Sequence, residues 1–283
     1  MNFGQQFLLL ATPAIATSML ATSPSQAATF AHSVAEFNIN GFSISPLGVQ
    51  TLTDTTTEAI SDGGQVSANA DATANFIADG TNSSLTSASN SSVSQAQGQG
   101  YNYIGKGASI AAIFGYNFKV QAGEKFSFDF NGLLNLETSI DDPNTELATA
   151  DGLLSLELYD STNGSLLDFF TIAGNLQTPG NDVFKIQQSS NIVFAPNQID
   201  IDKSTDGIQE YARASFNGTY SRIFKESTLV TLVEVKRNQV RVQVPECSSI
   251  LSSLFSCTVL GVTWIRKRQK SSSAALLVGN EER

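Results

Sequence analysis

The chain has 283 residues, of which 26 are Asp or Glu and 16 are Lys or Arg, so its formal charge is −10. This acidic balance argues against nucleic acid as a partner, because affinity for the phosphate backbone depends on Lys and Arg. His32 is the single histidine, which excludes a multi-histidine metal site and leaves any Ser-His-Asp centre one base near the N-terminus. Most hydrolase chemistry is therefore disfavoured.

The N-terminal segment has the features of a secretory signal peptide. The first 35 residues carry no charged side chain, and the stretch from Phe7 to Leu20 is mostly apolar. Small residues at Ser25 and Ala27 fit the rule for signal-peptidase sites, so we expect cleavage between Ala27 and Ala28. The usual positive residue at the start is missing. A buried N-terminal helix of the fold is the alternative for this segment.

Residues 28–100 show weak strand signals. Apolar residues alternate from Phe37 to Ile44, split by Gly41, which predicts a strand with a bulge. Residues 50–100 are rich in Ser, Thr, Asn, Gln, Ala and Gly and contain no Lys or Arg. Within them, alternation at 66–78 predicts a strand with a small-residue face, and 79–100 is predicted as a loop or flexible edge. A disordered spacer throughout is the alternative.

The strongest strand pattern begins at residue 108. Every even position from Ala108 to Val120 is apolar, which predicts one buried face. The alternation resumes from Phe126 to Phe130 after a turn at residues 121–125. We therefore predict a hairpin that supplies six aromatic side chains to one core.

Two further hairpins are predicted later in the chain. The first joins Leu154–Leu158 to Ser165–Ile172 through a polar turn. The second joins Leu229–Val235 to Val240–Val244, with residues 236–239 as its turn. No helical window of ten or more residues occurs between residues 28 and 245, which favours a body made of strands.

An acidic segment after the first of these hairpins offers a weak calcium site. Asp202, Ser204 and Asp206 match positions 1, 3 and 5 of a calcium loop, and Asp200 lies just upstream. Arg213 stands at the twelfth position, where an EF-hand needs a glutamate. A looser Ca²⁺ site on a sandwich loop is one interpretation, and a solvated acidic turn is the other. No other cofactor is predicted.

Three elements follow one another at the C-terminal end. Val244–Cys247 precedes an uncharged run at residues 248–265, and the basic triplet Arg266, Lys267 and Arg268 follows it. As a helix the run would reach ~27 Å, close to the ~30 Å thickness of the hydrocarbon layer. The triplet is expected on the cytoplasmic side, which places the body outside. A plain membrane anchor and a core helix of the body are the alternatives.

This ordered triad resembles the PEP-CTERM sorting signal of exported bacterial proteins handled by exosortase. Pro245 and Glu246 match the family's box, whereas Cys247 stands where the family has proline. The resemblance implies that an exosortase-type protease recognises residues 245–268 as a membrane-inserted sorting segment and removes the C-terminal tail during surface sorting. Residues 269–283 would form a cytoplasmic tail, and signal peptidase is the second expected partner.

The predicted fold class is all-β. We expect an antiparallel β-sandwich or jelly-roll-like body with an N-terminal signal helix at 1–27 and a single C-terminal transmembrane helix. Residues 101–244 form the core of the sandwich, together with part of 28–100. Both cysteines, Cys247 and Cys257, lie beyond this body. The body must therefore be stabilised by core burial without disulfides.

The favoured function is that of a non-enzymatic exported protein of the cell surface or extracellular matrix. The alternative is a module at the cell surface that binds extracellular polysaccharide. A module that acts on carbohydrate is a weaker form of this alternative. His32 is predicted to be an exposed bystander. Four sequons predict surface loops, at Asn82, Asn90, Asn163 and Asn217. The candidate side chains for stacking on sugar rings are Tyr101, Tyr103, Tyr159, Tyr211 and Tyr220.

Overall fold

The computed structural model describes residues 28–205 and 207–245, with only the backbone of residues 196–202. No α-helix occurs in this part of the chain, which therefore has no helical segment that could cross a bilayer. A 3₁₀ turn spans Ser83–Leu85. The strands are β1 (Ala28–Asn40), β2 (Gly48–Ser61), β3 (Gln65–Ile77), β4 (Ser87–Gln99), β5 (Tyr103–Val120), β6 (Lys125–Ser139), β7 (Leu147–Asp160), β8 (Leu166–Thr178), β9 (Val183–Gln188), β10 (Ile192–Ser204), β11 (Gln209–Ile223) and β12 (Thr228–Val244).

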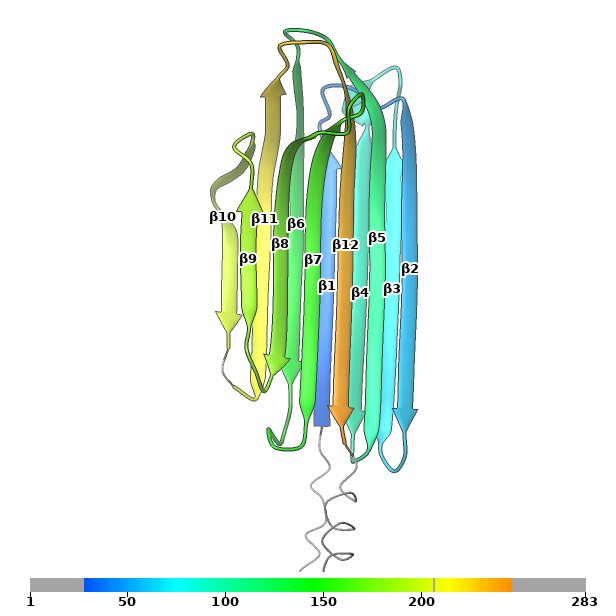
Figure 1. Ribbon diagram of the computed structural model, residues 1–283, viewed down its shortest axis with the longest axis vertical. Coiled ribbons are helices and arrows are strands. Elements are labelled where there is room, and N and C mark those ends of the chain that lie inside the picture. The colour runs from blue at the N-terminus through cyan, green and yellow to red at the C-terminus, as the bar shows by residue number, and fades with distance from the viewer. Residues whose placement is uncertain (1–27, 206, 246–283) are drawn as a thin grey trace, which may run out of the picture.

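Two six-stranded antiparallel sheets pack face to face and form a β-sandwich (Figure 1). Sheet A has the order β10-β11-β6-β1-β4-β3, and sheet B has the order β2-β5-β12-β7-β8-β9. The all-β class and the sandwich architecture are thus confirmed. β1 starts and β12 ends at the same end of the sandwich (Figure 1). The register agrees, because Ala28 pairs with Gln99 and Val244 pairs with Tyr103, only four positions further along the chain.

The hairpin predictions are confirmed for one pair and wrong for two. β7 and β8 pair as an antiparallel hairpin, as the sequence predicts. β5 and β6 follow one another in the chain but lie in opposite sheets, so the turn at 121–124 crosses the sandwich. Residues 236–239 are not a turn. They lie inside β12, where they pair in regular register with β5 on one side and β7 on the other.

The buried face of β5 changes along the strand. In its first half the odd positions face inward, including Gly105, Gly107 and Ser109, and the predicted even positions face outward. A bulge then shifts the register between Val230 and Leu232 of β12, and Asn117 takes a φ of 58°. Beyond the bulge the even positions are buried, as predicted. Four of the six predicted aromatics consequently reach the core, whereas Phe114 and Tyr116 stack on the outer face with ring centroids 6.0 Å apart.

The segment before residue 100 contains more strands than predicted. β3 confirms the strand predicted at 66–78. The prediction of a loop or edge at 79–100 holds for residues 79–86 and is wrong for Ser87–Gln99, because β4 occupies that range and pairs with β1 and β3 on both sides. β1 ends at Asn40, and Gly41 lies just beyond it with a φ of 64°, so it is not a bulge within the strand.

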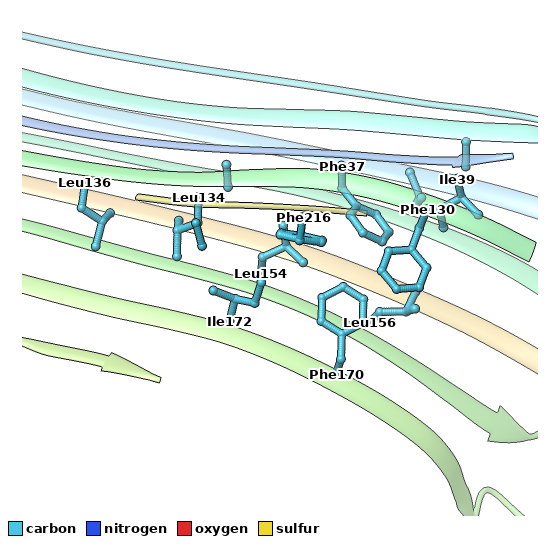
Figure 2. Packing of buried hydrophobic residues seen from close by; sticks show 14 of the residues in the cluster. Phe37, Ile39, Phe130, Leu134, Leu136, Leu154, Leu156, Phe170, Ile172 and Phe216 are labelled. Carbon is cyan, nitrogen blue, oxygen red and sulfur yellow. The ribbon is translucent and has the colours of Figure 1, made fainter. Parts of the chain in front are cut away.

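The core is tapered. At one side of the core the side chains are mostly aromatic. Phe37, Phe130 and Phe170 pack together there, with ring centroids 5.2–5.7 Å apart (Figure 2). At the other side, where β3 and β4 face β5, the sheets come much closer. A Cβ atom added at Gly107 would lie 2.9 Å from the backbone oxygen of Asn69. Small side chains on β3, β4 and β5 permit this close approach.

Candidate functional site

A layer of buried polar side chains lies between the two sheets. Its members occupy inward-facing positions of β4, β5 and β12, and none is more than 5% exposed. Apolar side chains normally fill such positions, because an unpaired buried polar group is costly. We call these residues the polar layer: Asn90, Ser92 and Ser94 on β4, Ser109 on β5, and Glu234, Lys236 and Asn238 on β12.

Three residues of the polar layer form a closed ring of hydrogen bonds. The Lys236 Nζ atom donates to Glu234 Oε1 at 2.6 Å and also to Asn90 Oδ1. The Asn90 Nδ2 atom donates to Glu234 Oε2. An amine, a carboxyl group and a carboxamide are therefore in mutual contact.

The strand geometry explains how the ring forms. Glu234 and Lys236 are two residues apart on β12, so both side chains point to the same face of sheet B. β12 lies between β5 and β7, and β4 lies between β1 and β3, so neither strand is at the edge of its sheet. Asn90 reaches across from sheet A, and the ring of Phe37 lies with its centroid 5.4 Å from the Lys236 Nζ atom. Both charged side chains are 0% exposed.

Burial changes the protonation of this cluster. Desolvation raises the pKa of Glu234 above its ordinary value, and Lys236 offsets part of this effect. Desolvation also lowers the pKa of Lys236 to about 8, against the opposing effect of Glu234. Both shifts favour the uncharged forms, because a charge is poorly solvated in the interior. The site can therefore present a neutral amine next to a carboxylic acid.

The serines of the polar layer fill the narrow part of the sandwich. The Ser109 hydroxyl lies 2.7 Å from the Ser92 hydroxyl and 2.9 Å from that of Ser94. Ser94 also donates to the backbone oxygen of Asn238 at 3.2 Å, and the Asn238 amide donates to the backbone oxygen of Ser92. These bonds join the sheets where larger apolar side chains would not fit.

The outer face of sheet A carries an ordered array of amides and hydroxyls. One row crosses five strands in register and consists of Asn217, Asn131, Asn38, Ser89 and Asn75. The Asn38 amide donates to Asn131 Oδ1 at 3.1 Å. Such rows of donors and acceptors can bind polar ligands such as sugars.

Two shallow hollows lie on this outer face. One has a volume of about 510 Å³ and places the half-buried Phe30 beside Gln65 and Gln97. The other has a volume of about 490 Å³ and is lined by Asp129 and Asn131 among others. An aromatic ring next to amide groups is a combination suited to a sugar ring.

The predicted sorting residues lie at or beyond the edge of the described chain. Ala28 begins β1, and its backbone nitrogen donates to Asp141 Oδ2 at 3.1 Å. Pro245 is exposed immediately after β12. The other predicted residues, Ala27, Glu246, Cys247, Arg266, Lys267 and Arg268, lie outside the described residues, as does the predicted transmembrane helix.

The candidate calcium ligands lie on β10 and in the segment just after it. Asp200, Asp202 and Ser204 belong to β10, where their backbone pairs with β11. The side chains of the two aspartates, and Asp206 as a whole, lie outside the description. Among the described side chains, no three His, Cys, Asp or Glu residues are arranged to hold a metal ion.

The candidate sugar platforms divide into two groups. Tyr103 is buried, and its hydroxyl oxygen lies 2.8 Å from the hydroxyl oxygen of Thr29. Tyr220 is also buried and donates to Asp168 at 3.1 Å, so neither ring can stack on a ligand. Tyr101 and Tyr211 are 45% and 38% exposed. Tyr159 is partly buried and donates to Glu157.

His32 is not a terminal bystander. It lies within β1, in the interior of sheet A, with its ring centroid 6.0 Å from that of Phe30. The ring is partly buried rather than exposed, and desolvation lowers its pKa below the ordinary value of 6.5.

The polar layer is not apparent from the residue types alone. The sequon at Asn90 predicts a surface loop, but Asn90 is buried on β4, and Asn217 lies on β11. Lys236 and Asn238 are polar, and polar residues between two apolar segments predict a turn. A strand pattern continued through 229–244 would have placed Glu234, Lys236 and Asn238 on the same inward face as Val242, which is the signal that could have revealed the site.

No family model, no curated protein and no solved structure matches this chain.

Proposed function

We propose that this chain is a non-enzymatic, exported β-sandwich protein, sorted to the cell surface or extracellular matrix through its PEP-CTERM-like C-terminal signal. The observation that supports this proposal is that β1 starts and β12 ends at the same end of the sandwich (Figure 1). The predicted signal peptide and the predicted sorting segment are therefore both attached at this end of the sandwich. Neither the cleavage before Ala28 nor the removal of the tail after Pro245 would interrupt a strand.

The expected route follows from the order of the segments. Signal peptidase removes residues 1–27, and residues 245–268 hold the body on the outer side of the membrane until an exosortase-type protease releases it. The body then needs no thiols, because residues 28–245 contain no cysteine and are stabilised by two packed sheets.

Neutralising the basic triplet tests the proposal. Replacement of Arg266, Lys267 and Arg268 by asparagine should leave the precursor misoriented or unprocessed, because these residues set the orientation. A control with the same loss of charge replaces the exposed Lys119, Lys125 and Lys225 of the body, and should mature normally.

The readout is the intact mass of the protein in surface, medium and membrane fractions, which gives both ends of the mature chain. Unchanged export and C-terminal maturation of the triplet variant would contradict the proposal. Recovery of the natural protein from the cytosol with residues 1 and 283 intact would contradict it as well.

A second candidate function is binding of extracellular polysaccharide by the outer face of sheet A. The hollow at Phe30 supports it, because an aromatic ring lies there next to Gln97 and Gln65. A glycan array with the exported protein should then show selective binding that Phe30→Ser together with Gln97→Ala abolishes. Leu52→Ser, on the outer face of sheet B, is the control. Equal signals for every glycan would rule this function out.

A further inference from the structure

The ring of Asn90, Glu234 and Lys236 brings together the groups needed to form an amide bond. Amide formation requires a nucleophilic amine, an acyl group with a leaving group, and a group that moves protons between them. Lys236 Nζ is the amine and contacts the Asn90 carboxamide directly. Glu234 contacts the other two through different oxygen atoms, Oε1 towards Lys236 and Oε2 towards the Asn90 nitrogen.

The surroundings exclude water from this contact. Glu234 and Lys236 are 0% exposed, and Asn90 is 5% exposed. Phe37 covers the amine with its ring centroid at 5.4 Å. A desolvated lysine is the form that acts as a nucleophile in proteins, and an acyl group shielded from water is not hydrolysed.

We infer that Lys236 Nζ and Asn90 Cγ become joined by an intramolecular amide bond, with Glu234 transferring the protons and ammonia leaving. The neutral amine attacks Cγ, and the Cγ–Nδ2 bond breaks. Glu234 gives a proton to Nδ2 from Oε2 and takes one from Nζ at Oε1, so it returns to its starting form. One amine and one carboxamide thus yield one secondary amide and one ammonia, and no oxidant, metal or cofactor takes part.

The protonation of the cluster agrees with this reaction. Burial keeps Glu234 protonated to a higher pH than an exposed glutamate, so it can donate a proton at the start. Burial also lowers the pKa of Lys236, which raises the fraction of uncharged amine. A salt bridge with a purely structural role would require the charged forms, whose burial is costly.

The bond would tie the two sheets together. Asn90 is on β4 of sheet A, Lys236 is on β12 of sheet B, and 146 positions separate them in the chain. Residues 28–245 contain no cysteine. The cross-link would therefore give this body the covalent constraint that disulfides provide in other exported proteins. The inference rests on the cluster alone and does not depend on the sorting signal or on the proposed function.

The experiment is a mass measurement of the complete protein after denaturation. One bond should lower the mass by about 17 Da relative to the sequence, because one ammonia is lost. Trypsin should not cut after Lys236. Since no Lys or Arg precedes Lys106, the digest should contain a branched peptide that joins the Asn90 segment ending at Lys106 to residues 226–237.

Three variants test the role of each group. Asn90→Ala, Lys236→Met and Glu234→Gln should each show the full sequence mass and normal, unbranched peptides. Asn131→Ala and Lys106→Met change the same residue types at exposed or partly exposed positions, and both should keep the mass loss.

The unaltered protein alone can overturn the inference. It fails if the folded protein has its full sequence mass and if Asn90 and Lys236 are found in separate peptides. A loss of the same mass without the branched peptide, as in cyclisation of an asparagine, overturns it too. This holds even if one of the three variants does not fold.

Discussion

Gly107 tests whether the sandwich is as narrow as the structure indicates. A methyl group at this position of β5 would lie 2.9 Å from the backbone oxygen of Asn69 in β3 and 3.2 Å from a methyl group of Val240. The Asn69 oxygen belongs to the backbone of the opposite sheet, so it cannot rotate away. Gly107→Ala should therefore push the sheets apart by a few tenths of an ångström.

The size of the effect follows from two opposing contributions. Overpacking a close-packed interior costs about 1–3 kcal/mol. Removing a glycine from a strand recovers about 0.5–1 kcal/mol of conformational entropy. The net loss in the free energy of unfolding is about 1 kcal/mol and at most about 2.5 kcal/mol; a loss of about 1 kcal/mol corresponds to a fall of roughly 2–4 °C in Tm for a body of this length.

The assay is thermal unfolding followed by circular dichroism, with Gly80→Ala as the matched control. No atom lies within 4 Å of a Cβ at Gly80, so this variant should keep its Tm or gain slightly. If the Tm of Gly107→Ala equals or exceeds that of Gly80→Ala, the sheets are not as close here as described. The explanation of the small-residue face is then wrong.

Three further predictions concern the core, a buried ionic group and pH. Phe170→Ala should lower the free energy of unfolding in urea by about 3–5 kcal/mol, whereas Leu166→Ala, 50% exposed, should change it by less than about 0.5 kcal/mol; equal effects would refute the packing. Asp168→Ala should cost about 3 kcal/mol in the same assay, because Asp168 accepts from Tyr220 at 3.1 Å and from Arg222 at 2.9 Å inside the sandwich; a neutral change would show that neither bond matters. Desolvation holds the pKa of His32 below 6.5 in the folded state, so the unfolded chain binds its proton first and stability falls as pH drops below 6.5. His32→Gln should flatten this part of the stability profile, and an unchanged slope would contradict the assignment.

Alternation of residue types predicted several of the strands but not the sheets to which they belong. The period of two identifies β5, β6, β7 and β8, yet it contains no information about the partner of each strand. A short polar turn closes the β7–β8 hairpin, and a similar turn at 121–124 instead carries the chain across the sandwich. The bulge at Asn117 reverses the buried face of β5, and nothing in the apolar pattern marks it in advance.

The site was missed because its residues break the rule that polar side chains face water. β4 contains mainly serine and glutamine, which favour a loop assignment. Ser92 and Ser94 are nevertheless buried, because Ser109 and the backbone of Asn238 satisfy their hydroxyls across a narrow gap. Only the packing of β4 in sheet A against β5 and β12 in sheet B shows that these polar residues hydrogen-bond to one another.

The place of β12 has a consequence for when this body can fold. β12 is the last strand of the described residues in chain order, but it lies between β5 and β7 in the middle of sheet B. Without it, sheet B would consist of two separate pieces, β2–β5 and β7–β8–β9. Sheet B can therefore form completely only after the chain up to Val244 is present. If the chain is exported, the residues before β12 would cross the membrane before the sandwich is complete. The arrival of β12 would then determine when the two sheets can close on each other.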